Sequence, residues 1–308
     1  MKKWIAAGII ILLFLGGAGL AWYAWATVPN SVYAIDTPID SSPAGCPGDV
    51  RFAVIGDYGI AGQPEADVAA LVDSWNIDGI FTVGDNNYPD GKADTIDANI
   101  GQYYQSYIAP YTGQYGPGAA ENRFFPAPGN HDWRSGSLQP YLDYFTLPGN
   151  ERYYDVTLNP VHFFVLDSDP REPDGRTANS SQAQWLQDKM AASTAPWKLA
   201  LMHHAPYSSS AKRPPDQEMR WPFAEWGATA VITGHDHIYE RLEAEGIVYF
   251  VNGLGGKDPY PIRRAAPESI VRYNEDYGAM LVNASPTCIN FSFYNRQNQL
   301  IDSYTLTQ

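Results

Sequence analysis

Short apolar runs that end in glycine and a polar residue recur along the chain. The runs at 51–55 and 79–83 each end in a Gly-Asp pair, and the apolar spacing of 65–75 predicts a helix between them. Buried strand, helix and buried strand are typical of a βαβ unit. Ligands of such sheets bind at the carboxyl ends of the strands, where Asp57 and Asp85 fall. We therefore expect a functional site at this edge of the sheet.

The same pattern continues through the rest of the chain. Helices are predicted around 94–108 and, behind a serine N-cap, at 180–193. Neither an internal repeat nor a second linker interrupts the pattern, so residues 49–308 are predicted to form one domain. Further strands are predicted within 124–133, 161–168, 195–204, 228–237 and 247–256, followed by a hairpin at 288–306.

The first residues have the pattern of a targeting segment. Lys2 and Lys3 precede an uncharged apolar run, 4–28, that is long enough to span a bilayer. Residues 24–26 form an A-x-A cleavage motif. We predict that 1–29 is either a signal peptide or a retained membrane anchor, and any membrane contact is expected through the apolar run only. Both alternatives predict export to a periplasmic or extracellular compartment.

Export changes the interpretation of the two cysteines. Residues 30–48 are polar, contain several Pro and Gly, and are predicted to be a linker. Cys46 lies at the end of this linker and Cys288 lies in the last strand region. In an oxidising compartment they are the one pair that can form an intramolecular disulfide, which would join the two ends of the domain.

Composition excludes one class of partner. The chain has 308 residues, of which 44% are hydrophobic and 14% aromatic, as suits a packed globular protein. Its net charge of −14 argues against a nucleic-acid-binding surface, which needs a basic face. The sequence therefore predicts no nucleic-acid partner.

Histidines gather at the predicted strand ends. Of six histidines, His162 lies inside an apolar run and is interpreted as a sheet histidine. Imidazole is the commonest protein ligand of metals, and the strand-end histidines accompany Asp57 and Asp85. A metal site built from several loops is therefore predicted. The five strand-end histidines are His131, His203, His204, His235 and His237.

The ordered motifs GDYG, GDNNY, GNHD, MHHAPY and GHDHIYER resemble those of the metallophosphoesterase superfamily. Within it, the chain is most similar to purple acid phosphatases of the small, single-domain type, over residues 50–306. The resemblance implies an α/β fold, a sandwich of two mixed β-sheets flanked by helices. It also implies a dinuclear metal centre that acts on a small phosphorylated substrate.

The resemblance assigns the first metal to Asp57, Tyr88 and His237. Tyr88 distinguishes the purple phosphatases from most relatives, because a phenolate is a hard anionic donor suited to Fe(III). Asp85 is implied to bridge the two ions, as a carboxylate with two oxygens can.

The second metal is assigned to Asn130, His203 and His235, a carbonyl oxygen and two imidazoles. Such an O/N site does not choose well among Fe, Zn and Mn. His203 stands four residues before Tyr207, in the register of the family's ligand, although an exchange of roles with the adjacent His204 stays open.

Catalytic roles are implied for two histidines. His131 is the candidate proton donor for the leaving group, and Asp132 either orients it or is a simple loop carboxylate. His204 would face the substrate. Some family members supply further histidines in the segment matching 208–221, but this chain has none there; its Lys212 and Arg213 either contact phosphate or are solvated loop cations.

The activity implied is phosphomonoester hydrolysis by a metal-activated hydroxide, working best in acid. Two alternatives stay open: a phosphodiesterase or nucleotidase on the same centre, and a non-enzymatic iron-binding protein. Residues 239–241 match the family's pattern and are expected to hold their loop.

Overall fold

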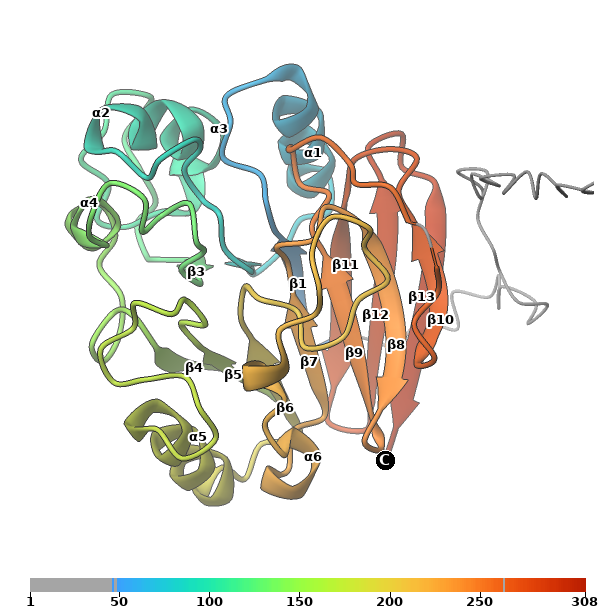
Figure 1. The fold of residues 1–308 in the computed structure, drawn as a ribbon. Helices are drawn as coiled ribbons and strands as arrows, with labels where there is room; N and C mark the ends of the chain where they lie inside the picture. The colour runs from blue at the N-terminus through green and yellow to red at the C-terminus, as the bar shows by residue number, and fades with distance from the viewer. Residues whose placement is uncertain (1–45, 47–48, 263) are drawn as a thin grey trace, which may run out of the picture.

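The computed structural model describes residues 46, 49–262 and 264–308. They form two mixed β-sheets flanked by helices, so the predicted fold class is confirmed. In Figure 1 the helices α1, α2 and α3 lie on one side of the paired sheets, and α5 and α6 lie on the other. Residues 1–29 and most of the predicted linker lie outside the described residues. No helix within the described ranges is long and apolar enough to cross a membrane.

The first sheet contains the βαβ unit that the sequence predicted. Its strand order is β13-β12-β11-β1-β2-β3, in which β1, β2 and β3 are parallel and the other neighbours antiparallel. The predicted C-terminal hairpin is formed by β12 and β13. The strands are β1 (Val50–Ile55), β2 (Gly79–Thr82), β3 (Phe124–Pro126), β11 (Gly278–Ser285), β12 (Cys288–Asn295) and β13 (Leu300–Thr307).

The second sheet supplies the remaining strand ends. Its order is β10-β8-β9-β7-β6-β5-β4, with β5, β6, β7 and β9 parallel. Residues 239–241, expected in a loop, instead begin strand β8. The strands are β4 (Tyr154–Leu158), β5 (Val161–Val165), β6 (Trp197–Leu201), β7 (Ala230–Thr233), β8 (Tyr239–Ala244), β9 (Ile247–Asn252) and β10 (Ser269–Tyr273).

The helices predicted at 65–75, 94–108 and 180–193 are present, with one interruption. The segment predicted around 94–108 is helical but contains a π-turn, and the Ser180 side chain caps α5 as expected. The helical elements are α1 (Gln63–Asp73), α2 (Ala93–Ile96), η1 (Asp97–Gly101), α3 (Gln102–Tyr104), η2 (Gln105–Tyr107), α4 (Gln139–Tyr144), α5 (Ser181–Ala192), η3 (Gln217–Met219) and α6 (Phe223–Trp226).

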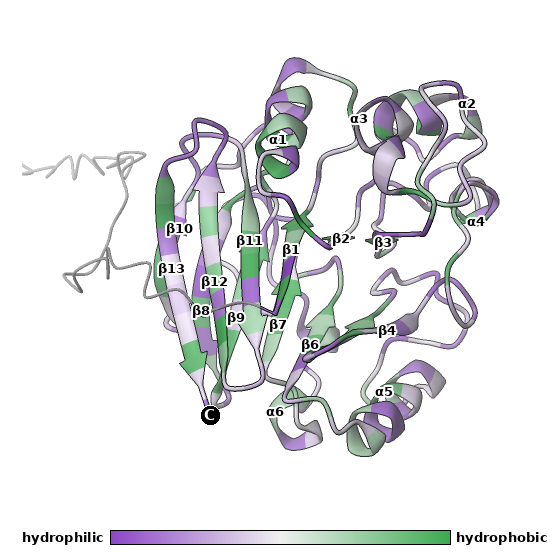
Figure 2. Ribbon diagram, turned by 180° about the vertical axis from the view of Figure 1, so that it is seen from behind, coloured by the Kyte–Doolittle hydropathy of each residue, from purple (hydrophilic) through white to green (hydrophobic). Residues whose placement is uncertain are grey.

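Aromatic side chains join the two sheets. Phe163 of the second sheet stacks on Phe81 of the first at 3.8 Å between ring centroids, and meets the edge of Phe52 at 4.7 Å. All three are fully buried. In Figure 2 the hydrophobic colour lies on inner strands such as β1 and β9, while α5 alternates between both colours. The strand ends are thus held by a rigid core.

The two cysteines are bonded, as predicted. Cys46 and Cys288 form a disulfide with 5.5 Å between their Cα atoms. The bond ties the segment before β1 to the start of β12, so residues from opposite ends of the sequence are joined beside the first sheet.

Candidate metal centre

The seven predicted ligands come together at the strand ends. Asp57 follows β1, Asp85 follows β2, and His235 follows β7. All three adopt positive φ angles, of 55°, 54° and 69°, which non-glycine residues seldom adopt. Such backbone conformations cluster at functional sites, where the surrounding structure holds them. Here each turn directs a donor side chain toward its neighbours across the strand ends.

Tyr88 is the centre of one group of donors. Its phenolic oxygen lies 2.9 Å from Asp85 Oδ2, 3.2 Å from Asp57 Oδ1 and 3.3 Å from His237 Nε2. All four side chains are buried. These oxygens and this nitrogen can surround one cation, and we refer to them as the first ligand group.

His203 is the centre of a second group. Its Nε2 atom lies 3.1 Å from His235 Nδ1, 3.2 Å from Asn130 Oδ1 and 3.3 Å from Asp85 Oδ1. The two oxygens of Asp85 therefore face different groups. The structure brings Asp85 into the position between two sites that the sequence predicted for a bridging carboxylate.

Backbone carbonyls fix the tautomers of two of the histidines. The Nδ1 atoms of His203 and His237 lie 2.8 Å from the carbonyl oxygens of Val83 and Asp258 respectively. A carbonyl only accepts, so each Nδ1 donates its hydrogen and each neutral ring presents a lone pair on Nε2. Each Nε2 lone pair faces the oxygen atoms of its ligand group, which are also electron-pair donors. A cation bound between them would attract all of these atoms.

The negative charge of the carboxylates in the two ligand groups also favours a cation between them. Burial opposes protonation of His203, but the adjacent Asp85 carboxylate raises the pKa of His203 to about 9. Asp57, Asp85 and His203 each offer one ligand atom within 4.8 Å of the others. The donor set of carboxylates, phenol, amide oxygen and imidazoles therefore fits a pair of transition-metal ions.

His131 lies beside the first ligand group. Its Nδ1 is 2.5 Å from the carbonyl oxygen of Pro89, and its Nε2 is 3.8 Å from Asp85 Oδ2. Burial lowers the pKa of His131, against the opposing pull of Asp85. The suggestion that Asp132 orients His131 is wrong, because Pro89 does so. The Asp132 carboxylate instead accepts hydrogen bonds from the Gly129 N–H (2.8 Å) and from Asn86.

The structure separates the adjacent histidines 203 and 204. His204 takes no part in either ligand group; its Nδ1 lies 2.9 Å from the Ser168 hydroxyl. Its ring stands 4.4 Å from that of His235, between centroids. In this geometry His203 lies among the donors of the second ligand group, and His204 faces the neighbouring pocket.

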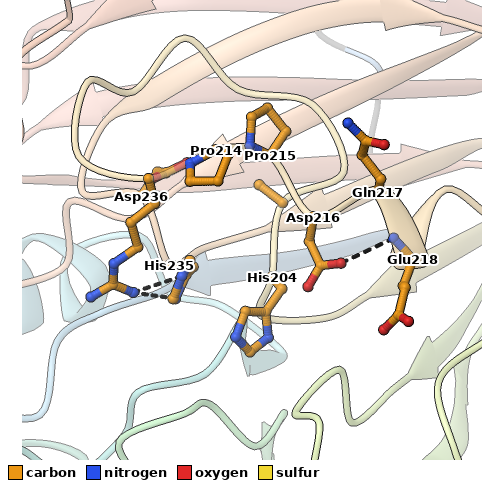
Figure 3. A pocket seen from close by; sticks show the side chains of 10 residues that line it. His204, Pro214, Pro215, Asp216, Gln217, Glu218, His235 and Asp236 are labelled. Carbon is orange, nitrogen blue, oxygen red and sulfur yellow. Dashed lines mark hydrogen bonds between the residues drawn. The ribbon is translucent and has the colours of Figure 1, made fainter.

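That pocket, of about 510 Å³, opens next to the second ligand group. Figure 3 shows the rings of His204 and His235 on its wall, facing a segment that includes Pro214, Pro215 and Asp216. Arg213 also lines the pocket. A substrate bound at both ligand groups would therefore extend into this space.

Asn86 is a positioning residue that sequence reasoning missed. Its side-chain oxygen accepts hydrogen bonds from Tyr58 Oη (2.9 Å) and Thr82 Oγ1 (2.6 Å). Its amide group donates to the Ala127 carbonyl (2.8 Å) and to Asp132 (2.9 Å). Fully buried, Asn86 links the loops that carry the ligands after β1, β2 and β3. Its place between Asp85 and Tyr88 was the one available signal.

A two-sheet sandwich with two ligand groups at its strand ends defines the metallophosphoesterase class. Residues 50–239, more than half of the chain, match the family Calcineurin-like phosphoesterase. The chain therefore belongs to the calcineurin-like phosphoesterase family, and this membership supports a metallophosphoesterase hydrolase.

Two of the similar proteins are acid phosphatases. The chain is 24% identical to purple acid phosphatase 17 of Arabidopsis thaliana over 303 residues, covering 86% of this chain and 87% of the relative. Tartrate-resistant acid phosphatase type 5 of Homo sapiens is 24% identical over 266 residues, covering 73% and 79% respectively. The predicted resemblance to purple acid phosphatases is confirmed.

A solved structure shows the same fold. The purple acid phosphatase PPD1 from yellow lupin seeds superposes with a TM-score of 0.67 at 18% sequence identity. The match covers 84% of this chain and 53% of that chain, so this chain corresponds to about half of the lupin protein.

Proposed function

We propose that this protein is an acid phosphatase of the purple type, which hydrolyses phosphate monoesters at a dinuclear metal centre. The observation that carries this proposal is the phenolic oxygen of Tyr88, which lies within 2.9–3.3 Å of Asp85, Asp57 and His237. A phenolate in a ligand group favours Fe(III) there, while the second ligand group suits Fe, Zn or Mn. The acid phosphatases among the relatives support the same assignment.

Bound metal ions would act as Lewis acids on the phosphate and lower the pKa of a bound water. The protein's own residues contribute position and protons. Asp85 sets the distance between the ligand groups, since one oxygen serves each. His131 has its Nδ1 fixed by Pro89, so its Nε2 is the atom that can give a proton to the leaving oxygen. His204, fixed by Ser168, faces the substrate pocket.

Export to a periplasmic or extracellular compartment is part of the proposal. It is supported by the Cys46–Cys288 disulfide, because such bonds persist in oxidising compartments.

The test uses the purified full chain and its Tyr88→Phe variant. Visible spectra, metal content, and hydrolysis of an aryl phosphate and its diester are measured at acidic pH. We expect a visible band that Tyr88→Phe abolishes, and faster turnover of the monoester. A colourless protein fully active with Mn or Zn alone would overturn the purple assignment. Faster diester turnover would identify a phosphodiesterase, and metal binding without turnover an iron-binding protein.

A further inference from the structure

Arg213 reaches the edge of the second ligand group. Its Nη1 atom lies 2.6 Å from Nε2 and 2.9 Å from Nδ1 of His235, and the side chain lines the pocket that His204 also faces. A neutral imidazole has a single acceptor nitrogen, since the other ring nitrogen carries a hydrogen, so it cannot accept from a guanidinium while it binds a metal ion. A cation held at His235 would therefore leave Arg213 without this partner, beside the centre and in the pocket.

Two arginines near the pocket, Arg171 and Arg176, are paired with carboxylates. Arg176 bonds Asp216 and lies 2.8 Å from Glu218, while Arg171 lies 2.6 Å from Asp169. Within the described residues, Arg213 forms no ion pair with any carboxylate. In a protein of net charge −14, a half-buried guanidinium without a carboxylate partner marks a place for an anion from outside.

The loop that carries Arg213 is tethered at both ends. On one side the Ser209 N–H donates to Glu240 at 2.7 Å, and the Ala211 N–H donates to the Pro261 carbonyl at 2.9 Å. On the other side the Asp216 N–H donates to the Ala205 carbonyl at 2.8 Å. Two consecutive prolines, 214 and 215, restrict the backbone between the tethers. Arg213 is therefore preorganised at the pocket rather than on a free loop.

We propose that Arg213 binds the phosphoryl oxygens of the substrate and gives the site its preference for a monoester, which has three free phosphoryl oxygens, over a diester, which has two. A guanidinium presents two parallel N–H donors that match two phosphate oxygens, and it keeps its charge at any working pH. It takes the place of the histidines that segment 208–221 lacks. This inference rests on the proposed phosphatase function, whose failure the experiment below detects separately.

The experiment compares wild type with Arg213→Gln and Arg213→Lys in the metal-loaded full chain. Inorganic phosphate is titrated by calorimetry, and kcat/KM is measured for an aryl phosphate and its diester. Arg213→Gln should weaken phosphate binding about 10- to 100-fold, the effect expected for lost hydrogen bonds to a charged group. It should reduce kcat/KM more for the monoester than for the diester. Arg213→Lys should recover part of both losses.

Lys212→Gln is the matched control. Lys212 is the adjacent cation of the same loop, is exposed, and lies 5.7 Å from the Tyr260 ring centroid. We expect wild-type phosphate affinity in this variant. Unchanged phosphate affinity in Arg213→Gln, equal losses on monoester and diester, or loss of bound metal would each overturn the role proposed for Arg213. A wild type that binds phosphate but hydrolyses neither ester would overturn the function, while weaker phosphate binding by Arg213→Gln would still support the anion site.

Discussion

Asp85 and Tyr88 are joined through only one of the two carboxylate oxygens. The Tyr88 hydroxyl donates to Asp85 Oδ2 at 2.9 Å, which leaves Oδ1 of the same carboxylate 3.3 Å from His203 Nε2. One short side chain thus belongs to both ligand groups. In the loop after β7, His235 lies in the second group and His237 lies in the first. These two histidines, although two residues apart, should therefore serve different metal ions.

His235→Ala and His237→Ala should therefore each remove a different ion. Metal analysis should find one ion lost in each variant, while Asp85→Ala loses both. Because Tyr88 belongs to the group of His237, the visible band should disappear in His237→Ala and persist in His235→Ala. His162→Ala is the control, since His162 bonds Asp155 and Ser193 away from the centre. Loss of the band in His235→Ala would contradict the division into two groups.

Asn86→Ala should destabilise the protein although Asn86 touches no substrate. Asp132 would lose its Asn86 side-chain partner and stay buried, and a buried acceptor without its donor costs about 1–3 kcal/mol. With the bonds to Tyr58 and Ala127 also lost, we expect a total of about 3 kcal/mol, measured by urea unfolding after chelation. Asn290→Ala, on strand β12, should cost less than about 1 kcal/mol. Equal losses in the free energy of unfolding would show that the hydrogen bonds of Asn86 stabilise the protein no more than those of Asn290.

The parallel strands and the donor residues that follow them could be predicted because their signals are local. A buried parallel strand has a continuous apolar run, and the donor residue follows it directly, as at Asp57 and Asp85. Strand β8 was missed because it carries charge: Glu240 is buried but bonds Ser209, and Arg241 bonds Asp302. Those partners are distant in sequence, so nothing near residue 240 indicates that its charge is accommodated.

The residues that support the site could not be predicted either, because their partners are also distant in sequence. Asn86 acquires its role from partners on three different strand ends, and an asparagine in a loop is unremarkable alone. The sequence left two interpretations of Asp132 open, and the structure decides between them: its carboxylate bonds Asn86, while His131 bonds Pro89. Which neighbour a loop side chain contacts depends on backbone geometry that a motif does not carry.

His131→Ala should separate catalysis from metal binding. The ring belongs to neither ligand group, so metal content and the visible band should stay as in wild type. Loss of a positioned proton donor should lower kcat about 100-fold or more. The deficit should be smaller for an aryl ester with a good leaving group, which needs less protonation, than for an alkyl ester. Loss of metal in this variant would make His131 a ligand instead.

Breaking the disulfide should lower stability without changing the centre. The bond joins residues 242 positions apart, and the chain-entropy account gives about 5 kcal/mol for a loop of that length. The double variant Cys46→Ser, Cys288→Ser should unfold at lower denaturant concentration yet keep its metal content and kcat. Treatment of wild type with a reductant should reproduce the shift and leave the double variant unaffected. A reductant effect of equal size in both proteins would assign the shift to another cause.

Glu65 should make the protein more stable in acid. Burial raises the pKa of Glu65 well above its usual value, although the N–H groups of Ile60 and Ala61 donate to its Oε2 and oppose the rise. The folded state thus keeps a proton that the unfolded chain releases at about pH 4.3. The contribution of Glu65 is complete below that pH and is lost as the pH rises through the folded pKa, by up to about 1.4 kcal/mol per pH unit.

Glu65→Gln removes this proton linkage, because its amide is neutral at every pH while its oxygen still accepts both N–H groups. Free energies of unfolding, measured with a chelator from acidic to neutral pH, should fall less steeply with rising pH in Glu65→Gln than in wild type. The exposed Glu121→Gln, as control, should give a curve parallel to that of wild type. If Glu65→Gln also ran parallel to wild type, Glu65 would not hold its proton in the folded state, and the stability in acid would need another group.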